Sequence, residues 1–139
     1  MRQVTHEFSI RSPGPGALDI TDPVRQWVRE SSVGAGVLTL YVRHTSASLM
    51  VQENYDPQVL RDMEAFLRRL VPPGDAIFRH TAEGPDDMPA HVRSALTHTS
   101  LSIPVVGGTP ALGTWQGIFL YEHRDHPHQR KVLAHLLGE

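Results

Sequence analysis

The sequence contains no cysteine, has Lys131 as its only lysine, and includes few aromatic residues. The lack of cysteine excludes disulfides, thiolate metal sites and a cysteine nucleophile. Neither sign of charge predominates, because 13 basic residues nearly balance 15 acidic ones. This balance argues against a nucleic-acid partner bound through bulk phosphate neutralisation, and it gives no attraction to a membrane surface. The sequence also lacks an apolar run of membrane-spanning length and an apolar N-terminal segment, so we expect a cytoplasmic protein.

The chain is nevertheless long and apolar enough to form a folded core. With 139 residues, of which 40% are hydrophobic, it is predicted to fold as a single domain over residues 1–139. Histidine is frequent, with nine residues in the chain. Imidazoles combined with carboxylates can bind a hard or borderline divalent metal even where cysteine is absent.

The spacing of apolar residues predicts an α+β fold with about seven strands and three helices. Alternating or continuous apolar runs predict strands at residues 3–10, 37–44, 47–53, 76–80, 101–105, 115–123 and 130–137. Apolar residues at helical spacing after capping and proline signals predict helices at 21–31, 57–70 and 89–96. The strand at 115–123 is apolar on both sides, which predicts a central place in a sheet. The polar segment 124–129 is typical of a hairpin-like turn.

Residues 43–48, Arg-His-Thr-Ser-Ala-Ser, place an imidazole and three hydroxyl groups at the end of a predicted strand. Beside a bound phosphate, such groups supply several neutral hydrogen-bond donors. Alternatively, the hydroxyls satisfy their own turn, as serine and threonine commonly do. The two-residue period puts His44 on the same face as Leu38, Leu40 and Val42, which predicts partial burial and a hydrogen-bonded core histidine as the alternative to a ligand.

Two carboxylates are notable for their positions. Glu53 shares a strand face with the apolar Leu49 and Val51, where an unpaired carboxylate is costly to desolvate, so we expect it to be paired or metal-bound. Asp62 lies beside the apolar stripe of the helix predicted at 57–70. It is either solvated or directed at a neighbouring subunit.

The richest group of potential ligands lies between residues 80 and 91. His80 is followed by Asp86, Asp87 and then His91. One interpretation is that Asp87 caps the next helix and that Asp86 adds favourable charge at its N-terminus. The other is that His80, His91 and His44 converge on a divalent metal, zinc or magnesium, because three histidines with an open position form a known catalytic zinc arrangement.

Two further segments favour structural roles. Residues 113–117 match no phosphate-loop or dinucleotide pattern, although Gln116 lies on an otherwise apolar strand face and needs a partner. His123, His126 and His128 look like a metal-binding tract. We expect them instead to lie on an exposed turn, because a flexible loop loses entropy when it chelates an ion.

Several blocks of the sequence follow the order that is typical of the bacterial YjbQ family. They are residues 44–49, 53–57, 62–64, 83–91, 99–101, 113–118 and 122–124, together with His80 and Arg130. The Gly-Thr-Trp-Gln block at 113–116 is the family signature. The chain therefore resembles the YjbQ family from about residue 36 to its C-terminus.

The resemblance implies a small α+β fold on one large mixed β-sheet and a homotrimer. It also implies a secondary thiamine-phosphate synthase activity, in which hydroxymethylpyrimidine diphosphate is coupled with thiazole phosphate and pyrophosphate is released. The pocket implied by the resemblance, combined with the metal hypothesis, assigns catalytic roles to Glu53, Asp62 and Asp87, substrate binding to Thr45, Ser46, Ser48, Thr114, Gln116 and Arg130, and metal ligation to His44, His80 and His91.

Charge suggests how such a pocket works. A departing diphosphate needs its developing negative charge neutralised by a metal ion or by arginine. The expected partner is then a small phosphorylated metabolite, with Glu53 or Asp87 as electrostatic support. The same polar residues fit two other hypotheses. One is a non-enzymatic trimeric module that binds a metal or a phosphorylated metabolite, and the other is an unrelated metal-dependent hydrolase.

Overall fold

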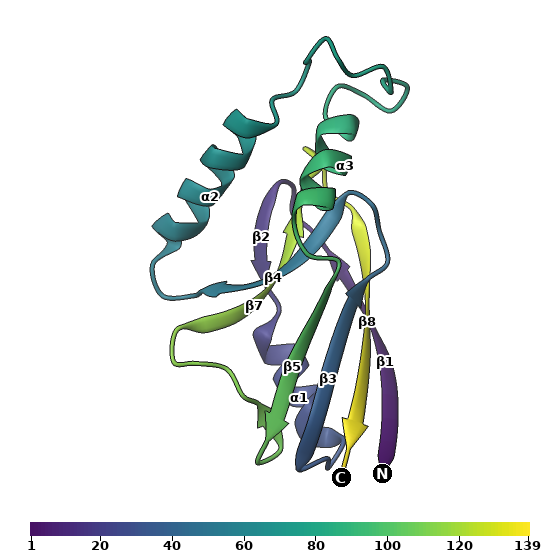
Figure 1. Cartoon of the computed structure of the whole chain (residues 1–139), viewed down its shortest axis with the longest axis vertical. Coiled ribbons are helices and arrows are strands. Elements are labelled where there is room, and N and C mark those ends of the chain that lie inside the picture. The colour runs from purple at the N-terminus through teal and green to yellow at the C-terminus, as the bar shows by residue number, and fades with distance from the viewer.

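Eight strands form two antiparallel sheets in the computed structural model, which describes all 139 residues (Figure 1). The five-stranded sheet has the order β1 (Arg2–Arg11), β8 (Gln129–Gly138), β3 (Ala35–Val42), β5 (Ser100–Val106) and β6 (Thr109–Pro110). The three-stranded sheet has the order β2 (Gly16–Asp19), β7 (Gln116–Glu122) and β4 (Ala47–Glu53). The helices are α1 (Thr21–Glu30), α2 (Pro57–Leu70) and α3 (Asp87–Leu96).

The main core lies where the inner faces of the strands meet α1. Leu38, Leu40 and Val42 of β3 are buried, as the two-residue period predicts. Val28 of α1 belongs to the same cluster of 16 buried apolar residues. This core includes residues of β3, β4 and β7, and several of the polar residues discussed below lie at or just beyond the ends of these strands.

The α+β class and the three helices are confirmed, whereas the sheets differ from the expected arrangement. Every strand pair is antiparallel, and the strands divide between two sheets instead of one large mixed sheet. The central position predicted for 115–123 is confirmed, because β7 lies between β2 and β4. The sequence did not predict β2 or β6, because strands of four and two residues are too short to show a clear apolar pattern.

Two local predictions are wrong. Residues 76–80 form no strand, and the N–H of Phe78 instead makes a turn hydrogen bond to the Asp75 carbonyl oxygen at 3.1 Å. Residues 124–129 do not close a hairpin, because β7 and β8 belong to different sheets. This segment instead carries the chain from one sheet to the other.

Helix α2 begins as predicted, with the side chain of Asp56 accepting a hydrogen bond from Gln58 N–H at 2.9 Å. The helix packs against the three-stranded sheet through Leu67, which contacts a small cluster of Met50, Phe119 and Tyr121. Only Leu67 is buried among its residues, while Phe66 and Leu70 of the predicted apolar stripe are 54% and 55% exposed. No helix of the structure is both long enough and apolar enough to cross a membrane.

Candidate metal centre

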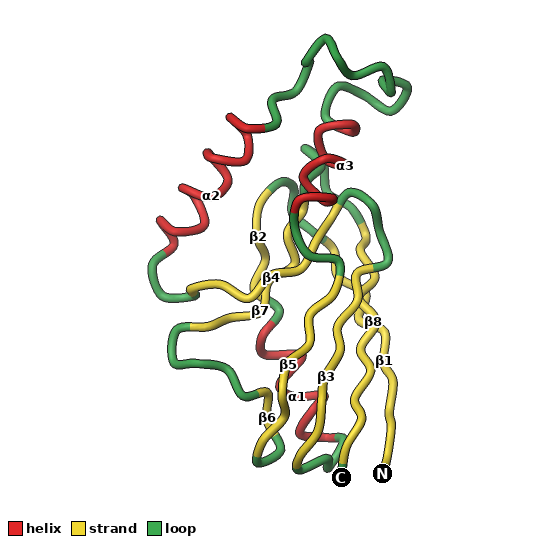
Figure 2. The backbone as a smooth tube through the Cα atoms, viewed as in Figure 1, coloured by secondary structure: helices red, strands yellow, loops and turns green.

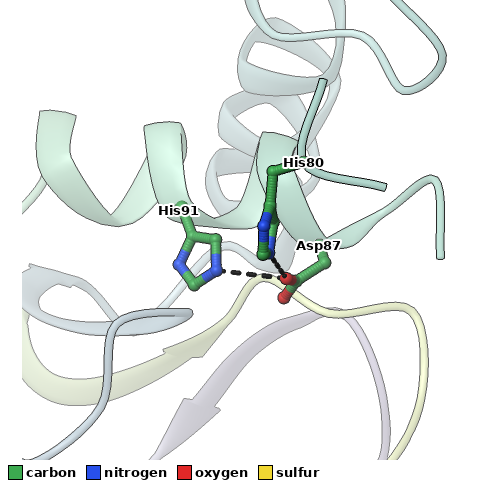
Figure 3. A group of neighbouring side chains, drawn as sticks. All are labelled: His80, Asp87 and His91. Carbon is green, nitrogen blue, oxygen red and sulfur yellow. Dashed lines mark hydrogen bonds and ion pairs between the residues drawn. The ribbon is translucent and has the colours of Figure 1, made fainter. Parts of the chain in front are cut away.

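His80, Asp87 and His91 bring one ligand atom each to the N-terminal end of α3 (Figure 3). Nε2 of His80 lies 2.8 Å from Oδ2 of Asp87, and Nε2 of His91 lies 3.1 Å from the same oxygen. All three ligand atoms lie within 4.8 Å of one another. The edge of a zinc tetrahedron with N and O ligands is roughly 3.3 Å, so only small shifts separate this cluster from a metal-binding geometry.

Two segments build this cluster by different means. Asp87 and His91 are four residues apart in α3, so they lie on the same helix face. His80 comes from the irregular segment 71–86 that connects α2 to α3 (Figure 2). That segment turns at Gly84, whose φ of 106° is readily adopted only by glycine.

Arg124 holds this segment against α3. Its Nε donates to Asp86 Oδ2 at 2.8 Å, and NH2 donates to the carbonyl oxygen of Glu83 at 3.0 Å. Its third nitrogen lies 3.1 Å from Oδ1 of Asp87, which leaves Oδ2 for the histidines. Neither aspartate caps α3 through its side chain. The prediction that Asp87 is the cap is therefore wrong, because its carboxylate is engaged by three basic side chains.

Both aspartates are held in the ionised form. Burial raises the pKa of Asp87, but the hydrogen bond from His80 and the charges of His91 and Arg124 outweigh burial and lower the pKa below its usual value. Burial likewise opposes ionisation of Asp86, but hydrogen bonds from Arg124 and from the Asp125 N–H lower its pKa to about 2. The cluster therefore offers a permanent negative charge to a cation.

The hydrogen bonds of His91 define which of its nitrogens can bind a metal. Nδ1 lies 2.9 Å from the carbonyl oxygen of Thr45, which can only accept, so Nδ1 carries a proton. Nε2 then faces Asp87 Oδ2, a second acceptor. The contact is attractive only if Nε2 is also protonated or if a cation lies beside both atoms. A backbone carbonyl that orients a histidine in this way is a frequent outer partner of metal-ligating histidine.

Comparison with known proteins identifies the family. A sequence model described as UPF0047 protein YjbQ-like matches residues 6–139. The chain belongs to the YjbQ family. Among its relatives, UPF0047 protein sll1880 of Synechocystis is 50% identical over 138 residues, covering 99% of this chain and 94% of the relative. YjbQ of Escherichia coli O157:H7 is 46% identical over 121 residues, covering 86% and 87%.

Solved structures of YjbQ-like proteins share the fold. A hypothetical protein from Aeropyrum pernix superposes with a TM-score of 0.84 and 32% identity, and both chains are fully covered. A YjbQ/UPF0047 protein from Clostridium acetobutylicum superposes with a TM-score of 0.83 and 34% identity, covering 96% of this chain and 99% of the other. These likenesses support the α+β architecture described above.

His44, the third predicted histidine ligand, lies outside the cluster in this YjbQ-family chain. Its Nε2 accepts a hydrogen bond from Lys131 N–H at 2.8 Å. It lines a surface hollow together with His91, but its ligand atoms are not among the three that converge. The partial burial predicted for His44 is confirmed.

Three predicted substrate-binding residues lie in a buried polar network. Arg130 is 4% exposed and binds both carboxylate oxygens of Glu122, with Nε to Oε1 at 2.7 Å. It also donates to Ser46 Oγ at 3.0 Å. Ser48 Oγ lies 2.8 Å from Nε2 of His123. These polar groups already have partners within the chain, whereas the side chain of Thr45 is exposed beside His91.

The remaining predicted residues lie at the other end of the three-stranded sheet. Glu53 and Gln116 are opposite each other where β4 ends and β7 begins. Glu53 is half-buried and accepts a 3.3 Å bond from Asp56 N–H, and Gln116 accepts from Gly113 N–H at 2.7 Å. Asp62 is exposed on α2 and accepts from Gln58, and Thr114 is exposed in the loop before β7. Within one chain, none of these residues belongs to the His80–Asp87–His91 group.

The expectation of an exposed histidine turn is wrong for His123, which is 2% exposed. Burial, followed by the charge of Arg93, lowers its pKa to about 3, so the ring is neutral. His126 is exposed and His128 is half-buried. Sequence reasoning also gave Arg124 no role. Its place after the buried strand β7 could have indicated a charge that faces inward.

Proposed function

We propose that the chain binds a divalent metal ion through His80, Asp87 and His91. The bonding of His91 supports this proposal most directly, because one nitrogen is committed to a carbonyl oxygen while the other faces a carboxylate. A cation among the three side chains satisfies both histidines without requiring imidazolium. Two imidazoles and one carboxylate suit zinc, and the open positions leave room for a ligand.

The metal ion, when bound, supplies positive charge to a phosphorylated substrate. Asp87 holds the ion electrostatically, and Arg124 keeps the free carboxylate oxygen of Asp87 in place at 3.1 Å. His80 and His91 would each present Nε2 to the ion, while the carbonyl oxygen of Thr45 would keep the ring of His91 in place through Nδ1. The resulting centre is half-exposed, with 49% of the His80 side chain and 30% of the His91 side chain accessible to a ligand.

The reaction that we propose follows the family resemblance. In the coupling of hydroxymethylpyrimidine diphosphate with thiazole phosphate, the bond from the methylene carbon to the diphosphate oxygen breaks, and its electron pair leaves with pyrophosphate. The thiazole nitrogen supplies the electron pair of the new bond to that carbon. A metal ion held by His80, Asp87 and His91 would supply positive charge beside the departing diphosphate.

The test combines metal analysis with a coupling assay. We expect purified protein to bind about one zinc per chain and to form thiamine phosphate above background, and we expect H80A and H91A to lose both properties. H126A is the matched control, because His126 is exposed and is not among the proposed metal ligands. Unchanged metal content in H80A and H91A overturns the metal assignment. Zinc binding without product overturns the coupling activity and favours the non-enzymatic binding module.

We also propose that the chain assembles as a homotrimer, as the family resemblance implies. The apolar face of α2 supports assembly, because Phe66 and Leu70 are more than half exposed while Leu67 alone is buried. Exposed apolar patches of this kind are typical of protein interfaces.

A further inference from the structure

A surface hollow of about 360 Å³ lies beside the metal centre. His91 forms one part of its wall, and His44, Thr45, Thr99 and Tyr41 form others. The hollow therefore adjoins one of the proposed metal ligands. Its remaining lining consists of three hydroxyl residues, one imidazole, one aromatic ring and the methyl group of Ala95.

A hydrogen bond from the backbone fixes which ring nitrogen of His44 carries the proton. Nε2 accepts a hydrogen bond from Lys131 N–H at 2.8 Å, so this nitrogen carries a lone pair. In the neutral ring the proton is then on Nδ1, which has no hydrogen-bond partner within the chain. His44 therefore presents one N–H donor. The hydroxyls of Thr45 and Thr99 also lack partners within the chain and are free to rotate toward an acceptor.

Burial and the neighbouring charges keep the ring of His44 neutral. Burial lowers the pKa of His44, and the nearby charge of Arg130 lowers it further, with Glu122 acting in the opposite direction. The ring therefore stays neutral and keeps its fixed donor pattern. Arg43, the residue before His44, is half exposed and forms an ion pair with Glu7 at 3.6 Å.

We propose that this hollow binds the phosphoryl group of a small phosphate monoester, with His44 Nδ1–H and the hydroxyls of Thr45 and Thr99 as donors. A phosphoryl group has three terminal oxygens, which match several separate donors, whereas a carboxylate has only two. Tyr41, 49% exposed, gives the organic part an aromatic surface. The contribution of the metal rests on the proposed function, whereas the donor set of His44, Thr45 and Thr99 does not.

Two replacements of His44 separate a ligand role from a structural one. In H44Q, the amide oxygen reaches the position of Nε2 and still accepts from Lys131, but the Nδ1–H donor is lost. In H44N the shorter side chain reaches only the Nδ1 position. Its amide can still donate there, but Lys131 N–H loses its acceptor. H98Q is the matched control, since His98 is exposed and does not line this hollow.

The experiment measures binding of inorganic phosphate, phenyl phosphate and acetate by calorimetry, with and without zinc. We expect phenyl phosphate to bind tighter than phosphate, and acetate to bind at least tenfold more weakly. H44Q should weaken phenyl phosphate binding about tenfold with unchanged zinc content and melting temperature, and H98Q should change nothing. H44N keeps an amide donor at the Nδ1 position but leaves Lys131 N–H without its acceptor, so it should lose stability while binding phenyl phosphate more tightly than H44Q does.

The outcomes distinguish this site from the metal centre. H80A should lose zinc but retain a residual, His44-dependent affinity for phenyl phosphate. Wild-type affinity in H44Q overturns the proposed site even if zinc binds normally. Equal binding of acetate overturns the assignment to phosphate, and equal binding of inorganic phosphate and phenyl phosphate overturns the assignment to a monoester.

Discussion

A hydrogen bond from His91 Nδ1 to the carbonyl oxygen of Thr45, 2.9 Å long, ties α3 to the loop that follows β3. The two residues are 46 positions apart in the chain. Because the acceptor is a backbone atom, the orientation of the ring depends on the path of the loop and not on the side chain of Thr45. The same loop carries His44, so the metal centre and the adjacent hollow share this segment of the chain.

Replacing Asp87 by asparagine should weaken zinc binding by more than tenfold. The change removes the negative charge that both histidines share and that Arg124 supports. Loss of an outer partner alone typically costs 10–100-fold in metal affinity, and Asp87 is a direct ligand in our proposal. Competition with a chromophoric chelator measures the change. Wild-type affinity in D87N, with normal folding by circular dichroism, would exclude Asp87 as a ligand.

Replacing Glu122 by glutamine should destabilise the fold by about 3–5 kcal/mol, because it leaves the charge of Arg130 buried without its partner. Both residues are almost completely buried, at 1% and 4% exposure. Urea unfolding of E122Q measures the loss. The double variant E122L/R130M serves as the comparison, since removing both charges should recover a large part of the stability. A loss below about 1 kcal/mol in E122Q would contradict the assigned role.

Stability should decrease as the pH falls below about 6.5, the pKa of histidine in an unfolded chain. Burial and the charge of Arg93 lower the pKa of His123 to about 3 in the native state. Between pH 6.5 and about 3, His123 is protonated in the unfolded chain but neutral in the native state, so lowering the pH favours unfolding. The slope from this one residue is at most about 1.4 kcal/mol per pH unit. Above pH 6.5 its contribution is constant.

The variant H123Q isolates this effect. It keeps a polar partner for Ser48 but cannot titrate. Urea unfolding between pH 7 and 5 should show a shallower slope in H123Q than in the wild type, and the remainder includes His44, whose pKa is also lowered by burial. An identical slope in both proteins would show that His123 is not held neutral.

Replacing Phe66 by glutamate should shift the assembly toward smaller species. Its side chain is 54% exposed in one chain, so the change removes an apolar contact surface without opening the core. Light scattering coupled to size exclusion measures the molecular mass. E30Q, at an exposed position on the distant helix α1, is the control. A wild-type mass for F66E across a dilution series would place the interface elsewhere.

Several local features of this molecule could be predicted from its sequence. The capping of α2 by Asp56, the buried face of β3 and the central place of β7 depend on neighbouring residues or on short periods. These features are set by backbone geometry over a few residues, so no knowledge of distant contacts is needed.

Tertiary packing decided which polar groups meet. His80 reaches Asp87 from an irregular segment, and His44 is turned away from that cluster by the backbone of Lys131. His123 is buried because the chain crosses from one sheet to the other instead of forming a hairpin. Hydrogen bonds and desolvation depend on distances between residues far apart in the chain, and those distances exist only after the two sheets and α3 have packed together.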